Sequence, residues 1–203
     1  MNREMIQKEE VQSFGKFPQE WILWRLKYLM SLRKEQSYGE GELLSVYLDR
    51  GVISYSDSTG KQVHKPSEDL SKYQKVYIND FVLNNQQAWR GSVGISRYNG
   101  IISPAYFVYE MSEKCFPEYM NYVLRDKSMV QQYELSSRGV GSIQRNINTD
   151  ALMCKYIVMP SISEQKQIAS FLDRKCAAID NAIEKTKESI AKLDEYKKSL
   201  ITK

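Results

Sequence analysis

The side chains best suited to chemistry in this sequence are amides and an arginine gathered between residues 84 and 92. The segment reads Asn-Asn-Gln-Gln-Ala-Trp-Arg-Gly-Ser. An asparagine or glutamine can form two hydrogen bonds with adenine, and an arginine can form two with guanine. The segment therefore has the chemistry to read base edges in DNA, although an ordinary polar loop has a similar composition. The candidate DNA contacts in it are Asn85, Gln86, Gln87, Trp89, Arg90 and Ser92.

Two further segments have side chains that suit phosphate groups or bases. One is the basic, polar loop that follows residue 32, and the other is the glycine-containing stretch 136–148. A backbone N–H at a glycine can approach a phosphate closely, because no Cβ stands in the way. A generic surface loop is the simpler alternative for both. The candidates from these two segments are Arg33, Lys34, Gln36, Arg138, Gly139, Gln144 and Arg145.

The residue types that enzymes need are scarce. His64 is the single histidine, and the three cysteines (Cys115, Cys154 and Cys176) are too widely spaced for a disulfide framework or a zinc site. The sequence contains neither a dinucleotide-binding nor a phosphate-binding glycine motif. A nuclease-like Glu-x-Lys pair at 195–197 lies where charges usually face solvent. We expect no catalysis, no bound metal and no cofactor in this chain.

The bulk composition fits one globular domain with an appended element. The chain has 203 residues, of which 42% are hydrophobic and 27% are charged. No apolar run reaches the length of a membrane span, and the amino terminus is too polar for a signal peptide. We therefore expect a cytoplasmic protein with no membrane partner. The net charge of +4 permits a nucleic-acid partner without requiring one.

Residues 1–159 are predicted to form a mixed α/β (α+β) domain with many short strands. Trp21 and Trp24 are expected to be core anchors, and Asn99-Gly100 suggests a turn with positive φ between two strands. Pro117 is expected to begin a helix that continues to about Tyr133. The predicted strands are bounded by turn signals and lie at 30–36, 46–48, 51–55, 75–78, 81–83, 93–96, 101–103, 104–109 and 152–158.

Residues 160–203 are predicted to form one long helix of a coiled coil. Ser161-Ile162-Ser163-Glu164 has the pattern of a capping box, and neither Pro nor Gly follows Pro160. The helix would be roughly 60 Å long, which exceeds what one small core can cover. Its stripe therefore calls for a partner helix, although a solvated helix folded back on its own domain is the alternative. The predicted seam is Leu172, Cys176, Ile179, Ile183, Thr186, Ile190, Leu193 and Leu200, with Lys197 in the same rhythm.

The helix also carries a family resemblance. The string Pro160-x-x-x-Glu164-Gln165-x-x-Ile168-Ala169-x-Phe171-Leu172-Asp173 resembles the conserved helix of type I restriction–modification specificity (S) subunits. Phe17-Pro18-x-x-Trp21 resembles the entry to that family's target recognition domain. The segments that resemble its middle are Asp80-Phe81-Val82, Trp89-x-Gly91-Ser92-x-Gly94-Ile95-Ser96 and Ile102-Ser103-Pro104-Ala105-Tyr106.

The resemblance implies a half-size S subunit or half of a larger one, because a full S subunit has two recognition domains and two antiparallel helices. It implies a homodimer that pairs its helices antiparallel and reads a bipartite inverted repeat in double-stranded DNA. The other implied partners are methyltransferase subunits and, through them, restriction subunits. S-adenosylmethionine, ATP and Mg would belong to those partners. Two alternatives stay open: a regulator or competitor that binds the methyltransferase unproductively, and a standalone nuclease.

Overall fold

The computed structural model describes residues 17–58, 66–139 and 145–201. The chain divides into two compact units, Met1–Gln165 and Lys166–Lys203. We call the first unit the head. The second unit continues the long helix α5, which begins at Ile162. This division and the predicted one after residue 159 lie on either side of the start of α5. The polar residues 1–13, whose composition favours a short or frayed helix, lie outside the described residues.

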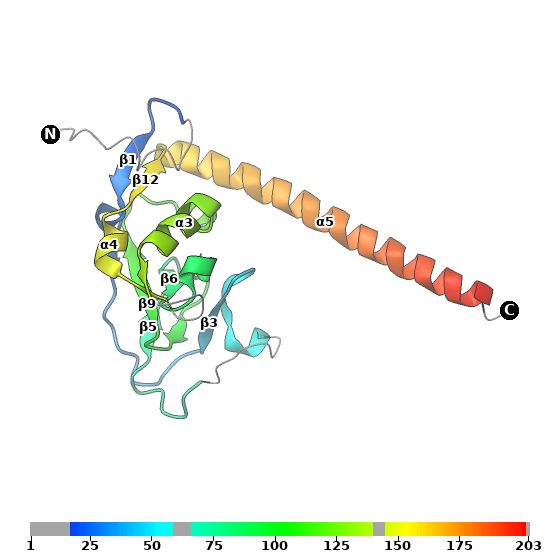
Figure 1. Ribbon diagram of the computed structural model, residues 1–203, viewed down its shortest axis with the longest axis horizontal. Helices are drawn as coiled ribbons and strands as arrows, with labels where there is room; N and C mark the ends of the chain where they lie inside the picture. Colours follow the sequence, from blue (N-terminus) through cyan, green and yellow to red (C-terminus); the bar gives the residue numbers. More distant parts are fainter. Residues whose placement is uncertain (1–16, 59–65, 140–144, 202–203) are drawn as a thin grey trace. The chain divides into compact units, whose positions relative to one another are not determined.

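Short strands dominate the described part of the head, so the predicted mixed α/β class is confirmed (Figure 1). Most of the predicted strands are present, with ends shifted by a few residues. The strands are β1 (Ile22–Arg25), β2 (Met30–Leu32), β3 (Leu44–Tyr47), β4 (Gly51–Ser54), β5 (Gln74–Val76), β6 (Phe81–Asn84), β7 (Val93–Ile95), β8 (Gly100–Ile102), β9 (Tyr106–Met111), β10 (Ser137–Arg138), β11 (Asn146–Ile147) and β12 (Tyr156–Met159).

The main sheet has the antiparallel order β2-β9-β6-β7. Its two central strands are apolar on both faces, because β6 begins Phe-Val-Leu and β9 contributes Val108 and Tyr109. Phe81 and Tyr109 are paired in register, and their rings stack with centroids 6.2 Å apart. The two-stranded sheets β1-β12, β3-β4, β5-β8 and β10-β11 complete the head. The sheet thus gives the head a rigid centre whose strand ends carry the candidate loops.

The predicted helix from Pro117 to about Tyr133 is instead two helices, α2 (Pro117–Leu124) and α3 (Lys127–Leu135). Asp126 between them is extended, and its carboxylate accepts a hydrogen bond from the Ser128 N–H at 2.8 Å. A capping residue with these dihedrals starts a new helix and cannot lie inside one. The Tyr133 hydroxyl donates to the Leu124 carbonyl, which ties α3 to the end of α2.

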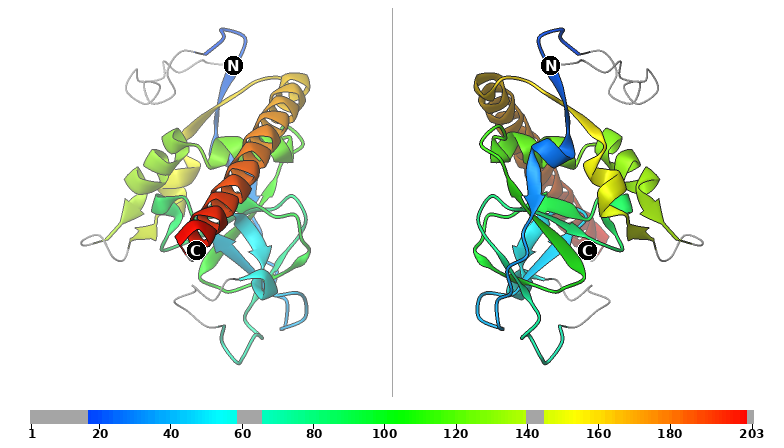
Figure 2. Two further views of the ribbon diagram at one scale, coloured as in Figure 1. Left: turned by 90° about the vertical axis from the view of Figure 1, so that its right-hand side faces the viewer. Right: turned by 90° about the vertical axis from the view of Figure 1, so that its left-hand side faces the viewer.

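The predicted strand 152–158 begins only at Tyr156, because Leu152 and Met153 belong to the short helix α4 (Thr149–Met153). The Asn148 side chain caps this helix by accepting from the Ala151 N–H at 3.0 Å. A local cap of this kind overrides the β propensity of the apolar residues that follow. Figure 2 shows α3 and α4 next to each other at one flank of the strands.

Two smaller predictions are corrected. Trp21 and Trp24 are half-buried and lie at the edge of the head, so they are not core anchors. Asn99 and Gly100 do not have positive φ, and β7 and β8 pair with β6 and β5 instead of with each other. A glycine is needed at 100 for a different reason: an added Cβ would overlap the Glu42 carbonyl oxygen.

The predicted long helix is confirmed as α5 (Ile162–Ile201), a single helix of 40 residues. It opens on the predicted capping box, in which the Glu164 N–H donates to Ser161 Oγ and the Ser161 N–H donates to Glu164 Oε2. The hydrogen bonds from Ser161 lower the pKa of the Glu164 carboxyl. Along the helix, the seam residues from Cys176 to Leu200 are exposed, and Leu172 is half-buried.

Gln165 ties the first turn of α5 to the head. Its side chain is 1% exposed. Its Oε1 accepts from the Phe116 N–H at 2.8 Å, and its Nε2 donates to the carbonyls of Lys114 and Pro160 at 3.0 Å. The side chain therefore satisfies three backbone groups at once.

We expect Gln165→Ala to lower the free energy of unfolding by about 2–4 kcal/mol, because buried backbone groups lose their partners. The matched control is Gln167→Ala, on the same helix turn but exposed, with an expected change below about 0.5 kcal/mol. Urea denaturation of both variants measures the difference. Equal stability of the two would contradict the anchoring role.

Candidate nucleic-acid interface

The ring of Trp89 brings two of the predicted segments together. The short helix η3 (Ala88–Arg90) presents this tryptophan. The guanidinium carbon of Arg90 lies 4.7 Å from the ring centroid, and that of Arg145 lies 5.0 Å from it. Guanidinium groups at this distance from an indole are held by cation–π attraction. We call Trp89, Arg90 and Arg145 the Trp89 cluster.

Hydrogen bonds fix the backbone beneath the cluster. Asn84 Oδ1 accepts from the N–H groups of Gln86 and Gln87 at 2.9 and 3.2 Å, which forms a tight turn after β6. Trp89 Nε1 donates to the Gln86 carbonyl at 3.0 Å. Gly91 then ends η3 with a φ of +97°, a region that favours glycine. The local sequence thus determines the orientation of the tryptophan.

Asn85 joins this turn to the second segment. Both its backbone carbonyl and its Oδ1 accept from the N–H of Ile147 in β11, at 3.2 and 3.0 Å. Arg145 lies just before β11 and pairs through Nη1 with Glu134 Oε1 at 2.7 Å. Glu134 belongs to α3 and was missed by the sequence interpretation, since nothing in the sequence links α3 to residue 145. The cluster is therefore assembled from three parts of the chain.

The other candidates of these two segments differ in how exposed they are. Gln86, Arg138 and Gly139 are exposed, and Gln87 is half-buried. The Ser92 side chain is buried and its hydroxyl donates to the Val46 carbonyl at 3.1 Å. A role in holding the turn against β3 fits its position. Gln144 lies outside the described residues.

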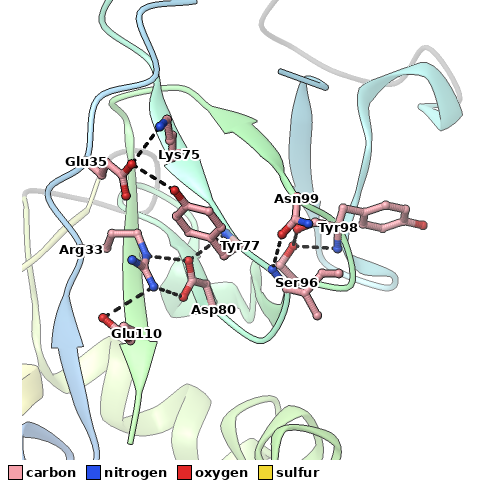
Figure 3. Close-up of polar contacts among 10 residues, drawn as sticks. Arg33, Glu35, Lys75, Tyr77, Asp80, Ser96, Tyr98, Asn99 and Glu110 are labelled. Atoms are coloured by element: carbon pink, nitrogen blue, oxygen red, sulfur yellow. Dashed lines mark hydrogen bonds and ion pairs between the residues drawn. The ribbon is translucent and has the colours of Figure 1, made fainter. Parts of the chain in front are cut away.

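Arg33 lies in an internal ion pair (Figure 3). Its Nε and Nη2 donate to the two carboxylate oxygens of Asp80 at 2.8 and 3.0 Å, and Glu110 lies 3.6 Å from Nη2. The Tyr77 ring covers the guanidinium at 4.7 Å, and the Tyr77 N–H donates to Asp80. The hydrogen bond with Asp80 raises the pKa of Arg33. This arrangement ties the segment after β2 to the segment before β6.

Two other residues of the segment after β2 also form hydrogen bonds within the head. Glu35 accepts from Lys75 Nζ at 2.9 Å and from the Tyr77 hydroxyl at 3.0 Å, and these bonds lower its pKa. Gln36 Nε2 donates to the Ser71 carbonyl at 2.8 Å, whereas Lys34 is exposed.

The two regions lie at opposite ends of β6. The Arg33 pair precedes Phe81, and the Trp89 cluster follows Asn84. The structure therefore brings together the segments 84–92 and 145–147 but does not bring the segment 33–36 to the same place. Arg33 is engaged in an ion pair with the buried Asp80, whereas Arg90 is exposed. The Trp89 cluster is therefore the better candidate interface.

We expect Asp80→Asn to lower the free energy of unfolding by about 2–4 kcal/mol, because Arg33 loses its charged partner in a site where Asp80 is only 3% exposed. Glu110→Gln is the control: its carboxylate is exposed and more distant, so we expect less than about 1 kcal/mol. Thermal and urea unfolding report both. If Asp80→Asn left the free energy of unfolding unchanged, the ion pair would not be what holds Arg33, and Arg33 would be available for another role.

Within the described ranges, no helix is long and apolar enough to cross a membrane. The same residues contain no group of His, Cys, Asp or Glu side chains that is arranged to hold a metal ion.

The family model of the type I restriction modification DNA specificity domain matches residues 18–193. The chain belongs to this family. The match includes the head, the Trp89 cluster and most of α5. As a member of this family, the chain carries a DNA specificity domain, and its head is followed by the long helix α5.

Solved structures of specificity subunits share the fold. The HsdS subunit from Thermoanaerobacter tengcongensis is 12% identical with a TM-score of 0.60, over 85% of this chain and 46% of that one. A chain from a structural study of complex assembly and conformational transition of the type I R-M system is 18% identical, with a TM-score of 0.54, over 88% and 45%. The S subunit from M. genitalium is 17% identical, with a TM-score of 0.51, over 79% and 40%. The chain thus spans less than half the length of each of these three chains.

Proposed function

We propose that this protein is the sequence-specific DNA recognition subunit of a type I restriction–modification system and acts as an antiparallel homodimer. The observation that carries the proposal is a single recognition head joined to a helix with a long exposed apolar stripe. An apolar stripe of heptad spacing is stabilised by burial against a second helix. A two-fold pair would present two identical heads to an inverted repeat in DNA.

The Trp89 cluster supports the DNA-binding part of the proposal. Arg90 is exposed, and its guanidinium lies over an indole, which reduces the entropy lost when it forms two hydrogen bonds. Gln86 and Arg138 add exposed polar groups with the same base-reading chemistry. The exposed cation Lys34 belongs to the other end of β6, where a phosphate contact would position the head without specifying sequence.

The partners follow from the proposed role. Methyltransferase subunits would bring S-adenosylmethionine and methylate adenine, and restriction subunits joined through them would bring ATP and Mg. This chain would supply the address and bind no cofactor itself. We place the complex in the cytoplasm, where its target DNA would be.

Co-expression with the methyltransferase subunit of the same system, followed by mapping of methylated adenines, tests the proposal. We expect one bipartite motif whose halves are inverted copies, and we expect Arg90→Ala to abolish or relax it. A motif with two unlike halves would contradict the homodimer. The absence of any new motif would favour the alternative of a regulator that binds the methyltransferase unproductively.

A further inference from the structure

The order of residue types along the apolar stripe of α5, and the charges beside it, define how two copies align. Its steps of four and three residues are those of heptad positions a and d. In an antiparallel pair with two-fold symmetry, each a position faces a d position of the second copy. Three alignments pair most of the stripe with itself, and they differ in which residue of the second copy faces Cys176: Thr186, Leu193 or Leu200.

The alignment of Cys176 with Leu193 leaves only Leu200 outside the seam, and the alignment of Cys176 with Leu200 leaves only Leu172 outside it. The two differ in where Lys197 falls. In the first, Lys197 falls at an outer end of the seam, where its ammonium group can reach water while its methylenes cover the facing leucine. The facing pairs, each occurring twice, are Leu172 with Lys197, Cys176 with Leu193, Ile179 with Ile190, and Ile183 with Thr186.

The flanking charges support the same alignment. In an antiparallel pair, e positions of the two helices lie beside each other. Asp180 of each copy then lies beside Lys187 of the other, close to the two-fold axis. The unfavourable pair, Asp173 beside Asp194, lies at the outer ends, where water screens the repulsion.

The alignment of Cys176 with Leu200 has worse electrostatics. Lys197 would face Ile179, nearer the middle of the seam. Lys187 would lie beside its own counterpart, so two like charges would meet at the axis. Like charges at such positions destabilise a pair and specify against it.

The alignment of Cys176 with Thr186 conflicts with the head. Lys197 would face Gln165, whose side chain is buried and hydrogen-bonded to Lys114, Phe116 and Pro160. That position cannot receive a second helix without breaking those bonds. Asp180 would also lie beside its own counterpart.

Resting on the proposed homodimer, we infer that two copies of α5 pair with Cys176 facing Leu193, so that the two-fold axis crosses between Glu184 and Lys185. This alignment sets the span between the two heads. A slip by one heptad would change that span by about 10 Å along the helix, or about three base pairs of DNA. The alignment is thus the part of the seam that defines the spacer length of the target.

Cysteine cross-linking tests the alignment, with Cys176 as the fixed point. In a Cys154→Ser background, which leaves the buried Cys115 and the exposed Cys176, three variants are compared: Thr186→Cys, Leu193→Cys and Leu200→Cys. Residues 176 and 193 of one helix are about 25 Å apart, so a disulfide between them must join two chains. After mild oxidation, we expect Leu193→Cys to run mainly as a linked dimer and the other two to remain mainly monomeric under denaturing conditions.

Each outcome has one meaning. Efficient linkage of residue 176 of one chain to residue 186 or residue 200 of the other, identified by peptide mapping, overturns the alignment and leaves the homodimer intact. Linkage of the background protein through Cys176 alone indicates parallel helices and overturns it too. If no variant links and the native mass is that of one chain, the proposed homodimer itself fails.

A second measurement alters only Cys176 among the seam residues. Arg174 lies on the outer face of α5, and a spin label at Arg174→Cys in a Cys154→Ser, Cys176→Ser background leaves the large apolar residues in place. The inferred alignment separates the two labels by about 32 Å along the axis, and the alternatives by about 21 and 42 Å. A measured separation matching either alternative would overturn the inference.

Discussion

The double variant Ile183→Asp, Ile190→Asp is expected to be a monomer with an intact head. Both isoleucines are at a positions of the stripe, and in the single chain they are 46% and 55% exposed. A dimer would bury four of them, at about 1.5–3 kcal/mol each when burial is complete. Because about half of each side chain is already covered in the single chain, their loss amounts to roughly 3–6 kcal/mol, which weakens dimerisation by about 10²- to 10⁴-fold. Aspartates that face an apolar seam add a desolvation cost in the same direction.

Sedimentation or native mass measurement reports the change, and circular dichroism confirms that the helix persists. Asn181→Asp combined with Ala191→Asp is the matched control, because it adds the same charge to exposed positions outside the stripe. We expect the control to remain a dimer. If the stripe variant also remained a dimer, α5 would pair through another face.

Trp89→Ala is expected to reduce affinity for the cognate DNA more than the loss of either arginine alone. One indole contacts the guanidinium groups of both Arg90 and Arg145, so its removal takes the cation–π contact from both. Each well-placed arginine contact with a base contributes about 1–3 kcal/mol. We therefore expect a loss of about 2–4 kcal/mol, or about 30- to 1,000-fold in affinity.

Trp89→Phe is the control, since it keeps an aromatic face and loses only the hydrogen bond from Nε1 to Gln86. We expect Phe to restore most of the affinity. Binding is measured on cognate and scrambled duplexes at fixed salt, because phosphate contacts affect both alike. An Ala variant that stays folded and binds the cognate duplex like the wild type would remove the cluster from the interface.

The sequence alone determined the features whose causes are local. The span of α5 and its capping box follow from residues three or four positions apart, and so does the stripe. The turn that ends at Gly51 and the strands beside it are likewise set by neighbours in the chain. The breaks at Asp126 and Asn148 were local too, but their capping side chains competed with stronger helix and strand signals and were misassigned.

How the candidate DNA-binding side chains are used depends on contacts between distant parts of the chain. Arg33 and Arg90 look equivalent in the sequence, yet Arg33 pairs with Asp80, 47 residues away, and Arg90 stays at the surface beside Trp89. The approach of Arg145 to that tryptophan depends on β11 and on Glu134, which no spacing in the sequence connects. Periodicity records which face of an element is apolar, whereas a long-range ion pair depends on where separate elements meet. For this reason the long helix could be predicted from the sequence, whereas the sequence suggested Trp89, Arg90 and Arg145 as candidates without indicating that they meet.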